Sequence, residues 1–313
     1  MPPEIFDLTE QISLTPEAAV GIPLALIGAV LLSLGAQFQH RGVARMEEHQ
    51  GTQASSGLNL AQIKGLLARP SWVLGTTFLG LAIVFQLSSL ALAPIMVVQP
   101  LGAVALVMTA IMNSRVAKIR LDAISIRAIM MSVIGVGAFV TIAAQFAKST
   151  PINERELSIV LVILVVVLAL WLVLFALFRK NASPVFYILG AGMLFGFVAT
   201  LAKVVIDRIK TIAITGTGIE STDFLTVLCI VGLIAASLLG SYFVQTAYAS
   251  GPPDLVVAGL TVVDPLVAVS VGIIVLGEAS NAPLWAVIAF VVTGAIAIFG
   301  VFSLSKHHPQ LKS

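Results

Sequence analysis

Apolar positions dominate this chain and run in long stretches that polar residues interrupt only briefly. A helix needs ~20 apolar residues to cross the hydrocarbon core of a bilayer, so these stretches predict membrane-spanning helices. Nine are expected, with the bounds 19–39, 72–92, 95–113, 125–146, 157–178, 184–205, 224–248, 255–276 and 283–304. The pattern therefore predicts an all-α integral membrane protein.

Polar segments divide the chain around these helices. Residues 1–18 are expected to form an extracytoplasmic tail, and residues 305–313 a cytoplasmic tail. The longest polar stretch, 41–71, is expected to be a cytoplasmic loop. It interrupts a first group of helices over 19–178, and a second group follows over 184–304. None of the polar segments is long enough to predict an additional folded domain.

The two groups of helices resemble each other and carry prolines in corresponding places. Five spans separate equivalent helices, so the second copy enters the membrane in the opposite sense. The expected architecture is thus a 5+4 inverted repeat. Helix breaks are expected at Pro94, Pro100, Pro252, Pro253 and Pro265. Proline frees backbone carbonyls that lipid cannot satisfy, so matched breaks indicate a transporter with a central site.

Charged residues are sparse and unevenly placed. They make up 10% of the chain, against about 25% in soluble proteins. With the N-terminus outside, twelve Lys and Arg fall on the inner side and four on the outer. This bias predicts that the N-terminus lies outside and the C-terminus inside. The expected location is the plasma (inner) membrane. The protein is expected to lie in lipid and to bind no nucleic acid. Whether it forms a homodimer is left open.

Asp264 is the most isolated carboxylate, about ten residues into the eighth span and followed by Pro265. A charge at mid-membrane costs at least ~2.5 kcal/mol and is functional by default. Asp264 is therefore the candidate proton or cation site, and the one candidate metal ligand. The alternative is a carboxylate that stays protonated or caps a half-helix after Pro265. Glu278, by contrast, is expected to be a solvated charge at the membrane edge.

Further candidates are a lysine and several amides inside the spans. Lys203 could attract an anionic group or face Asp264 across a cavity; the alternative is an ion pair with Asp207, four residues on. Amides both donate and accept hydrogen bonds, so they can orient a substrate or offer oxygens to a cation. Their alternative role is hydrogen bonding between helices. The candidate amides are Gln39, Gln86, Gln99 and Gln245.

Short motifs in both halves resemble the drug/metabolite transporter (DMT) superfamily. Residues 257–266, followed by Leu-Gly-Glu at 276–278, resemble EamA-type members. Residues 39–45 and 93–103, the latter reading APIMVVQPLGA, resemble NIPA-type magnesium transporters, as does Lys203. The resemblance implies a DMT-type bundle, and its NIPA-like part implies Mg²⁺ as a substrate.

These features predict a gradient-driven secondary transporter of a small metabolite or drug-like solute. No enzyme signature or nucleotide-binding motif is visible, and no cofactor is expected beyond coupling to protons or Mg²⁺. Two alternatives remain: a divalent-cation (Mg²⁺) transporter of NIPA type, and a non-transporting membrane scaffold or accessory subunit. A polar cavity that reaches Asp264 and Gln99 favours transport, whereas a closed, dry interior favours the scaffold.

Overall fold

The computed structural model is built of α-helices joined by short turns in the residues that it describes. Those residues are 16–50, 68–117, 122–148, 152, 154–178, 183–215, 223–250 and 253–307. The expected tails, the loop at 41–71 and Pro252 lie wholly or mostly outside them. Within the described part, the structure confirms the all-helical membrane bundle that the sequence predicts.

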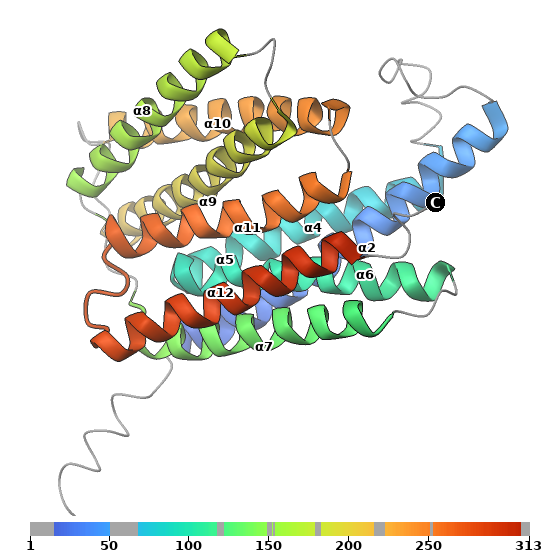
Figure 1. The fold of residues 1–313 in the computed structure, drawn as a ribbon. Helices are drawn as coiled ribbons and strands as arrows, with labels where there is room; N and C mark the ends of the chain where they lie inside the picture. Colours follow the sequence, from blue (N-terminus) through green and yellow to red (C-terminus); the bar gives the residue numbers. More distant parts are fainter. Residues whose placement is uncertain are drawn as a thin grey trace, which may run out of the picture.

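The helices follow the predicted spans closely (Figure 1). In the first half they are α2 (Pro16–Gln50), α4 (Pro70–Leu92), α5 (Ile95–Leu101), α6 (Ala103–Ala117) and α7 (Ala123–Phe146). α8 (Glu154–Phe178) is the fifth span and follows them before the second half begins. The second half consists of α9 (Pro184–Thr215), α10 (Asp223–Ser250), α11 (Pro253–Ile274) and α12 (Leu284–His307). α5 and α6 together take the place of one predicted span. Eight spans among the described residues are long and apolar enough to cross a membrane, and the apolar part of α11, Gly259–Ile274, is shorter.

Two helices extend beyond their predicted ends. α2 continues to Gln50, where the sequence predicted a loop from residue 41. α9 continues to Thr215 instead of ending near residue 205. Both extensions are rich in charged residues, which the hydropathy pattern interprets as the end of the span. A helix satisfies its own backbone hydrogen bonds, so it can continue into the polar region after leaving the apolar layer.

The prolines of the first half lie at a real interruption. α4 ends at Leu92, and α5 begins at Ile95, directly after Pro94. Pro100, however, lies inside α5, and the interruption before α6 comes two residues later at Gly102. The first half therefore contains a short helical piece of seven residues between two interruptions.

The prolines of the second half have a different effect. Pro253 is the first residue of α11, where a missing N–H costs nothing because that group has no helical partner. α11 then runs through Pro265 without interruption, so the break predicted there is wrong. A proline inside a membrane helix removes one backbone hydrogen bond, and packing against neighbouring helices preserves the rest of the helix.

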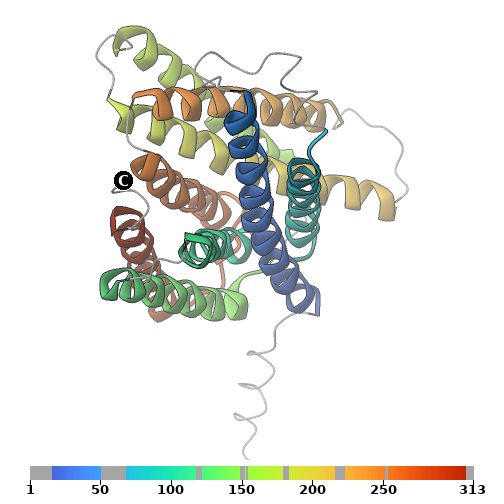
Figure 2. The ribbon, with the colours of Figure 1, turned by 90° about the vertical axis from the view of Figure 1, so that its right-hand side faces the viewer.

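Equivalent helices of the two halves pack in equivalent pairs. α2 packs against α4 and α9 packs against α10, and the last helices of both halves, α7 and α12, pack against each other. α5 contacts α11 between the halves. Figures 1 and 2 show α8, α9 and α10 on one side of the bundle and α7 and α12 on the other. These pairs agree with a repeated arrangement of helices, and the inverted sense of the second copy stays a prediction.

The outer surface is apolar, as a lipid-facing surface must be. α8 lies at the edge of the bundle (Figure 1) and exposes large side chains such as Val162 (61%) and Val165 (61%). A water-soluble monomer rarely exposes such continuous apolar area. α8 therefore supplies lipid-facing surface, and the functional site has to be sought among the other helices.

Glycine allows α2 and α4 to pack closely against each other. A Cβ on Gly75 would lie 2.6 Å from the backbone nitrogen of Gln39 and 2.8 Å from the carbonyl oxygen of Gly35. Ser89 Oγ donates to the Gly21 carbonyl oxygen at 2.7 Å further along the same helix pair. Small residues at such crossings let backbones approach in a membrane, where packing drives association.

Gly75→Ala is therefore expected to lower the free energy of unfolding by about 1–3 kcal/mol, because α2 and α4 must move apart. Thermal unfolding in detergent measures the effect. Gly80→Ala on the same helix is the matched control, since a Cβ there meets nothing within 4 Å. The control should unfold at or slightly above the wild-type temperature. Equal midpoints for the two variants would refute the close-packing account.

Candidate functional site

A cavity of about 370 Å³ lies between α2, α4, α5 and α11. Four polar side chains contribute to its wall: Gln86 from α4, Gln99 from α5, and Thr261 and Asp264 from α11. The remaining lining residues are Gly28, Ala29, Leu32, Ala82, Ile83, Leu87, Gly102, Leu260 and Pro265. Residues from both halves thus meet at one polar patch in a mostly apolar wall. The cavity is not closed, because its lining residues Leu32, Ile83 and Leu87 are exposed.

Among the described residues that line the cavity, Asp264 is the one charged group. Its Oδ1 atom is buried and has no hydrogen-bond partner within that part of the chain. α9 approaches the backbone here through glycine, because a Cβ on Gly196 would lie 2.9 Å from the Asp264 carbonyl oxygen. The predicted capping alternative is wrong, since α11 does not restart after Pro265. A buried carboxylate oxygen without a partner is unfavourable, and the residue that carries it also lines the cavity.

The amide candidates separate into two groups. Gln86 and Gln99 line the cavity, and Gln99 is 8% exposed. Gln39 instead donates from Nε2 to Thr76 Oγ1 at 3.0 Å, which joins α2 to α4. Gln245 is exposed on α10 and is not among the described residues that line the cavity. The structure therefore brings together two of the four predicted amides and assigns Gln39 the helix-to-helix role.

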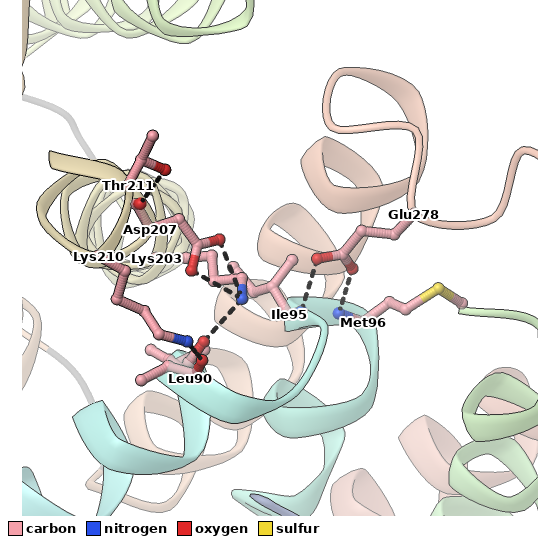
Figure 3. A network of polar contacts seen from close by, with 9 residues as sticks. Leu90, Ile95, Met96, Lys203, Asp207, Lys210, Thr211 and Glu278 are labelled. Carbon is pink, nitrogen blue, oxygen red and sulfur yellow. Dashed lines mark hydrogen bonds and ion pairs between the residues drawn. The ribbon is translucent and has the colours of Figure 1, made fainter. Parts of the chain in front are cut away.

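Lys203 is buried but belongs to a different contact (Figure 3). Its Nζ atom lies 3.1 Å from Asp207 Oδ2, and it donates to the Leu90 carbonyl oxygen at 2.8 Å. Lys203 is not among the described residues that line the cavity. The ion pair with Asp207 is thus the alternative that the structure contains, and Lys203 also connects α9 to the end of α4.

Glu278 is the residue that sequence reasoning missed. It is 2% exposed, so the prediction of a solvated charge is wrong. Figure 3 shows its two oxygens directed at the start of α5, where they accept the N–H groups of Ile95 (2.7 Å) and Met96 (2.8 Å). One signal in the sequence could have found it: a break after Pro94 leaves N–H groups that require an acceptor.

The cavity does not resemble a dedicated metal cage. Within the described part of the chain, no three His, Cys, Asp or Glu residues come close enough to hold one ion. Asp264, with the amides of Gln86 and Gln99, offers oxygen acceptors from three helices. Mg²⁺ dehydrates reluctantly and is usually bound by one or two carboxylates while keeping several waters. The wall can therefore serve a hydrated cation, which needs acceptors for the ion's water molecules.

The membrane bundle, with a polar cavity where its halves meet, defines the class of membrane transporters. The chain belongs to the NIPA magnesium transporter family, whose model matches residues 17–309. This confirms the resemblance to NIPA-type members of the DMT superfamily. The chain is also similar to an uncharacterized protein of Corynebacterium glutamicum, with 25% identity over 288 residues, 92% of this chain and 95% of the relative. No solved structure matches this chain.

Proposed function

We propose that this protein transports Mg²⁺, and that the ion crosses the membrane through the cavity at Asp264 in partly or fully hydrated form. The observation that carries this proposal is Asp264, which lines the cavity and whose buried Oδ1 atom lacks a partner among the described residues. The family of the chain supports the choice of ion.

The size and chemistry of the cavity suit a hydrated divalent cation. Six water molecules occupy roughly 180 Å³ at ~30 Å³ each, and the cavity measures about 370 Å³. Asp264 supplies negative charge, while Gln86 and Gln99 can accept hydrogen bonds from water bound to the ion. One carboxylate binds Mg²⁺ weakly, and weak binding allows release on the far side of the membrane.

The first expectation from sequence, a metabolite or drug-like solute, is the weaker candidate. The described lining holds one carboxylate and no basic side chain, so an anionic metabolite would meet repulsion without a compensating partner. An organic cation remains the competitor to Mg²⁺. The scaffold alternative predicted a dry interior, and an unpartnered carboxylate beside a large cavity speaks against it.

The orientation belongs to the same proposal. The distribution of Lys and Arg, twelve against four, supports an N-terminus outside and a C-terminus inside the plasma membrane. In that orientation α4 runs outward, so the interruption at Pro94 and the Lys203 contact lie near the external side. The cavity at Asp264 then lies deeper in the membrane than this contact.

Flux into liposomes tests the proposed substrate. The full-length protein is reconstituted with a Mg²⁺-sensitive dye inside, and Mg²⁺ is added outside with and without an imposed proton gradient. We expect saturable Mg²⁺ entry above that of protein-free liposomes. Organic cations are added as competitors in a parallel series. Transport of an organic cation without any Mg²⁺ entry would reject Mg²⁺ as the substrate and favour the small-solute alternative.

A further inference from the structure

The interruption between α4 and α5 leaves backbone groups without helical partners on both sides. The final carbonyl groups of α4 cannot bond within their own helix, and lipid offers them no donor. Lysine side chains of α9 supply donors from the other half of the chain: Lys203 donates to the Leu90 carbonyl oxygen at 2.8 Å, and Lys210 to that of Ala91. The end of α4 is thus held by charged groups.

Glu278 holds the start of α5 with both of its carboxylate oxygens. The Ile95 N–H donates to Oε1 at 2.7 Å and the Met96 N–H to Oε2 at 2.8 Å. The next two N–H groups of α5 both reach the Pro94 carbonyl oxygen at 3.1 Å. All of the first four N–H groups of α5 therefore have partners. Glu278 supplies the partners of the first two, one oxygen to each N–H.

A specific turn places Glu278 over α5. Gly277 has φ 64°, a conformation that suits glycine, and it turns the chain back after α11. Two backbone hydrogen bonds fix Glu278. Its N–H donates to the Gly272 carbonyl oxygen (3.0 Å), and its carbonyl oxygen accepts from the backbone N–H of Lys148 (2.9 Å). Gly272 also leaves room for this approach: a Cβ there would lie 2.5 Å from Ile95 Cγ2.

The short helix that Glu278 holds carries part of the cavity wall. α5 has seven residues, which corresponds to a length of roughly 10 Å. Gln99 lies one turn after Ile95, and both Gln99 and Gly102 line the cavity. A piece of two turns moves as one body, so the position of its first residues sets the position of Gln99. α11 leads into the turn with Glu278 and also carries Asp264.

We propose that Glu278 is a positioning residue for transport: by anchoring the start of α5, it holds Gln99 in the cavity wall that contains Asp264. Glu278 is not itself among the described lining residues, so it acts through α5 and does not touch the ion. The consequence for Mg²⁺ rests on the proposed function. The anchoring of α5 does not, and it can be measured separately.

Glu278→Gln tests the proposal with little change in size. The glutamine amide has one acceptor oxygen for the N–H groups of Ile95 and Met96. One of these two N–H groups then faces the amide NH₂, which is itself a donor. Hydrogen–deuterium exchange of residues 95–101, measured on the full-length protein in lipid, should become about tenfold faster. In reconstituted flux, KM for Mg²⁺ should rise by about tenfold while Vmax per folded protein stays near wild type.

A second variant and a control accompany it. Gly272→Ala keeps the carboxylate but places a Cβ 3.0 Å from Glu278 Oε2, so it should act in the same direction and serves if Glu278→Gln does not fold. Glu154→Gln removes an exposed acid at the start of α8 and should change neither quantity.

The outcomes separate the positioning role from the transport proposal. Unchanged exchange of residues 95–101 in both variants overturns the anchoring. A reduced Vmax at the wild-type KM overturns the positioning role, because it indicates only a loss of active protein. Absence of Mg²⁺ flux in the wild-type protein overturns the proposed function instead, and the exchange rates still decide whether Glu278 holds α5.

Discussion

Asp264→Asn is expected to reduce Mg²⁺ flux at least about 100-fold in reconstituted liposomes. Asparagine keeps the size of the side chain and removes its charge, so the cavity loses its one described anionic group. Unit charges 4 Å apart interact by about 4 kcal/mol at an effective dielectric constant near 20. A loss of about 2.7 kcal/mol already corresponds to 100-fold in binding. Glu154→Gln is the matched control, and its flux should equal that of wild type.

The same variant should be more stable than wild type when Mg²⁺ is absent. The buried Oδ1 atom has no described hydrogen-bond partner, so removing the charge relieves a desolvation cost. We expect the free energy of unfolding to rise by about 1–3 kcal/mol. Thermal unfolding in detergent measures this change. A carboxylate with a structural role would behave in the opposite way, and a lower stability together with lost flux would assign Asp264 that role.

Lys203→Met is expected to lower the free energy of unfolding by about 3–5 kcal/mol. Methionine fills similar space but leaves Asp207 and the Leu90 carbonyl oxygen without the ammonium group that they contact. Removing one partner of a buried pair costs this much because the other charge stays buried and uncompensated. The thermal unfolding midpoint of the full-length protein in detergent measures the effect.

Two further variants show whether burial is the cause. Lys210→Met removes an ammonium group from an exposed position on the same helix and should cost less than about 1 kcal/mol. The double variant Lys203→Met with Asp207→Leu should recover part of the stability, because no unpaired carboxylate remains. Similar losses for Lys203→Met and Lys210→Met would show that burial of the lysine contributes nothing.

Hydropathy and proline placement were enough to locate the spans and part of the candidate site. Asp264, Gln86 and Gln99 could be selected because polar groups inside apolar stretches are costly in lipid. The structure places all three at one cavity. Whether they act on a cation stays a prediction, and the variants above are designed to test it.

The contacts around the broken helix could not be predicted in the same way. Glu278 and Ile95 are 183 residues apart, and their contact depends on the backward turn at Gly277. Hydropathy alone places Glu278 in a polar loop, because it does not show which chain ends meet in space. Lys203 illustrates the same limit. Its pairing with Asp207 follows from helical spacing, but its bond to Leu90 depends on how α9 packs against α4.

Protection of a cysteine in the cavity tests the central claim most directly. Cys229, the one cysteine of the chain, is replaced by Ala, and Thr261→Cys places a thiol in the wall one turn from Asp264. The rate of labelling by a neutral thiol reagent is then measured with and without Mg²⁺ at constant ionic strength.

Mg²⁺ bound at Asp264 should slow labelling roughly tenfold when its concentration is ten times its Kd. Adding Asp264→Asn should abolish this protection without blocking labelling itself. If the thiol reacts at the same rate with and without Mg²⁺ while Asp264 is intact, the cavity is not the Mg²⁺ site.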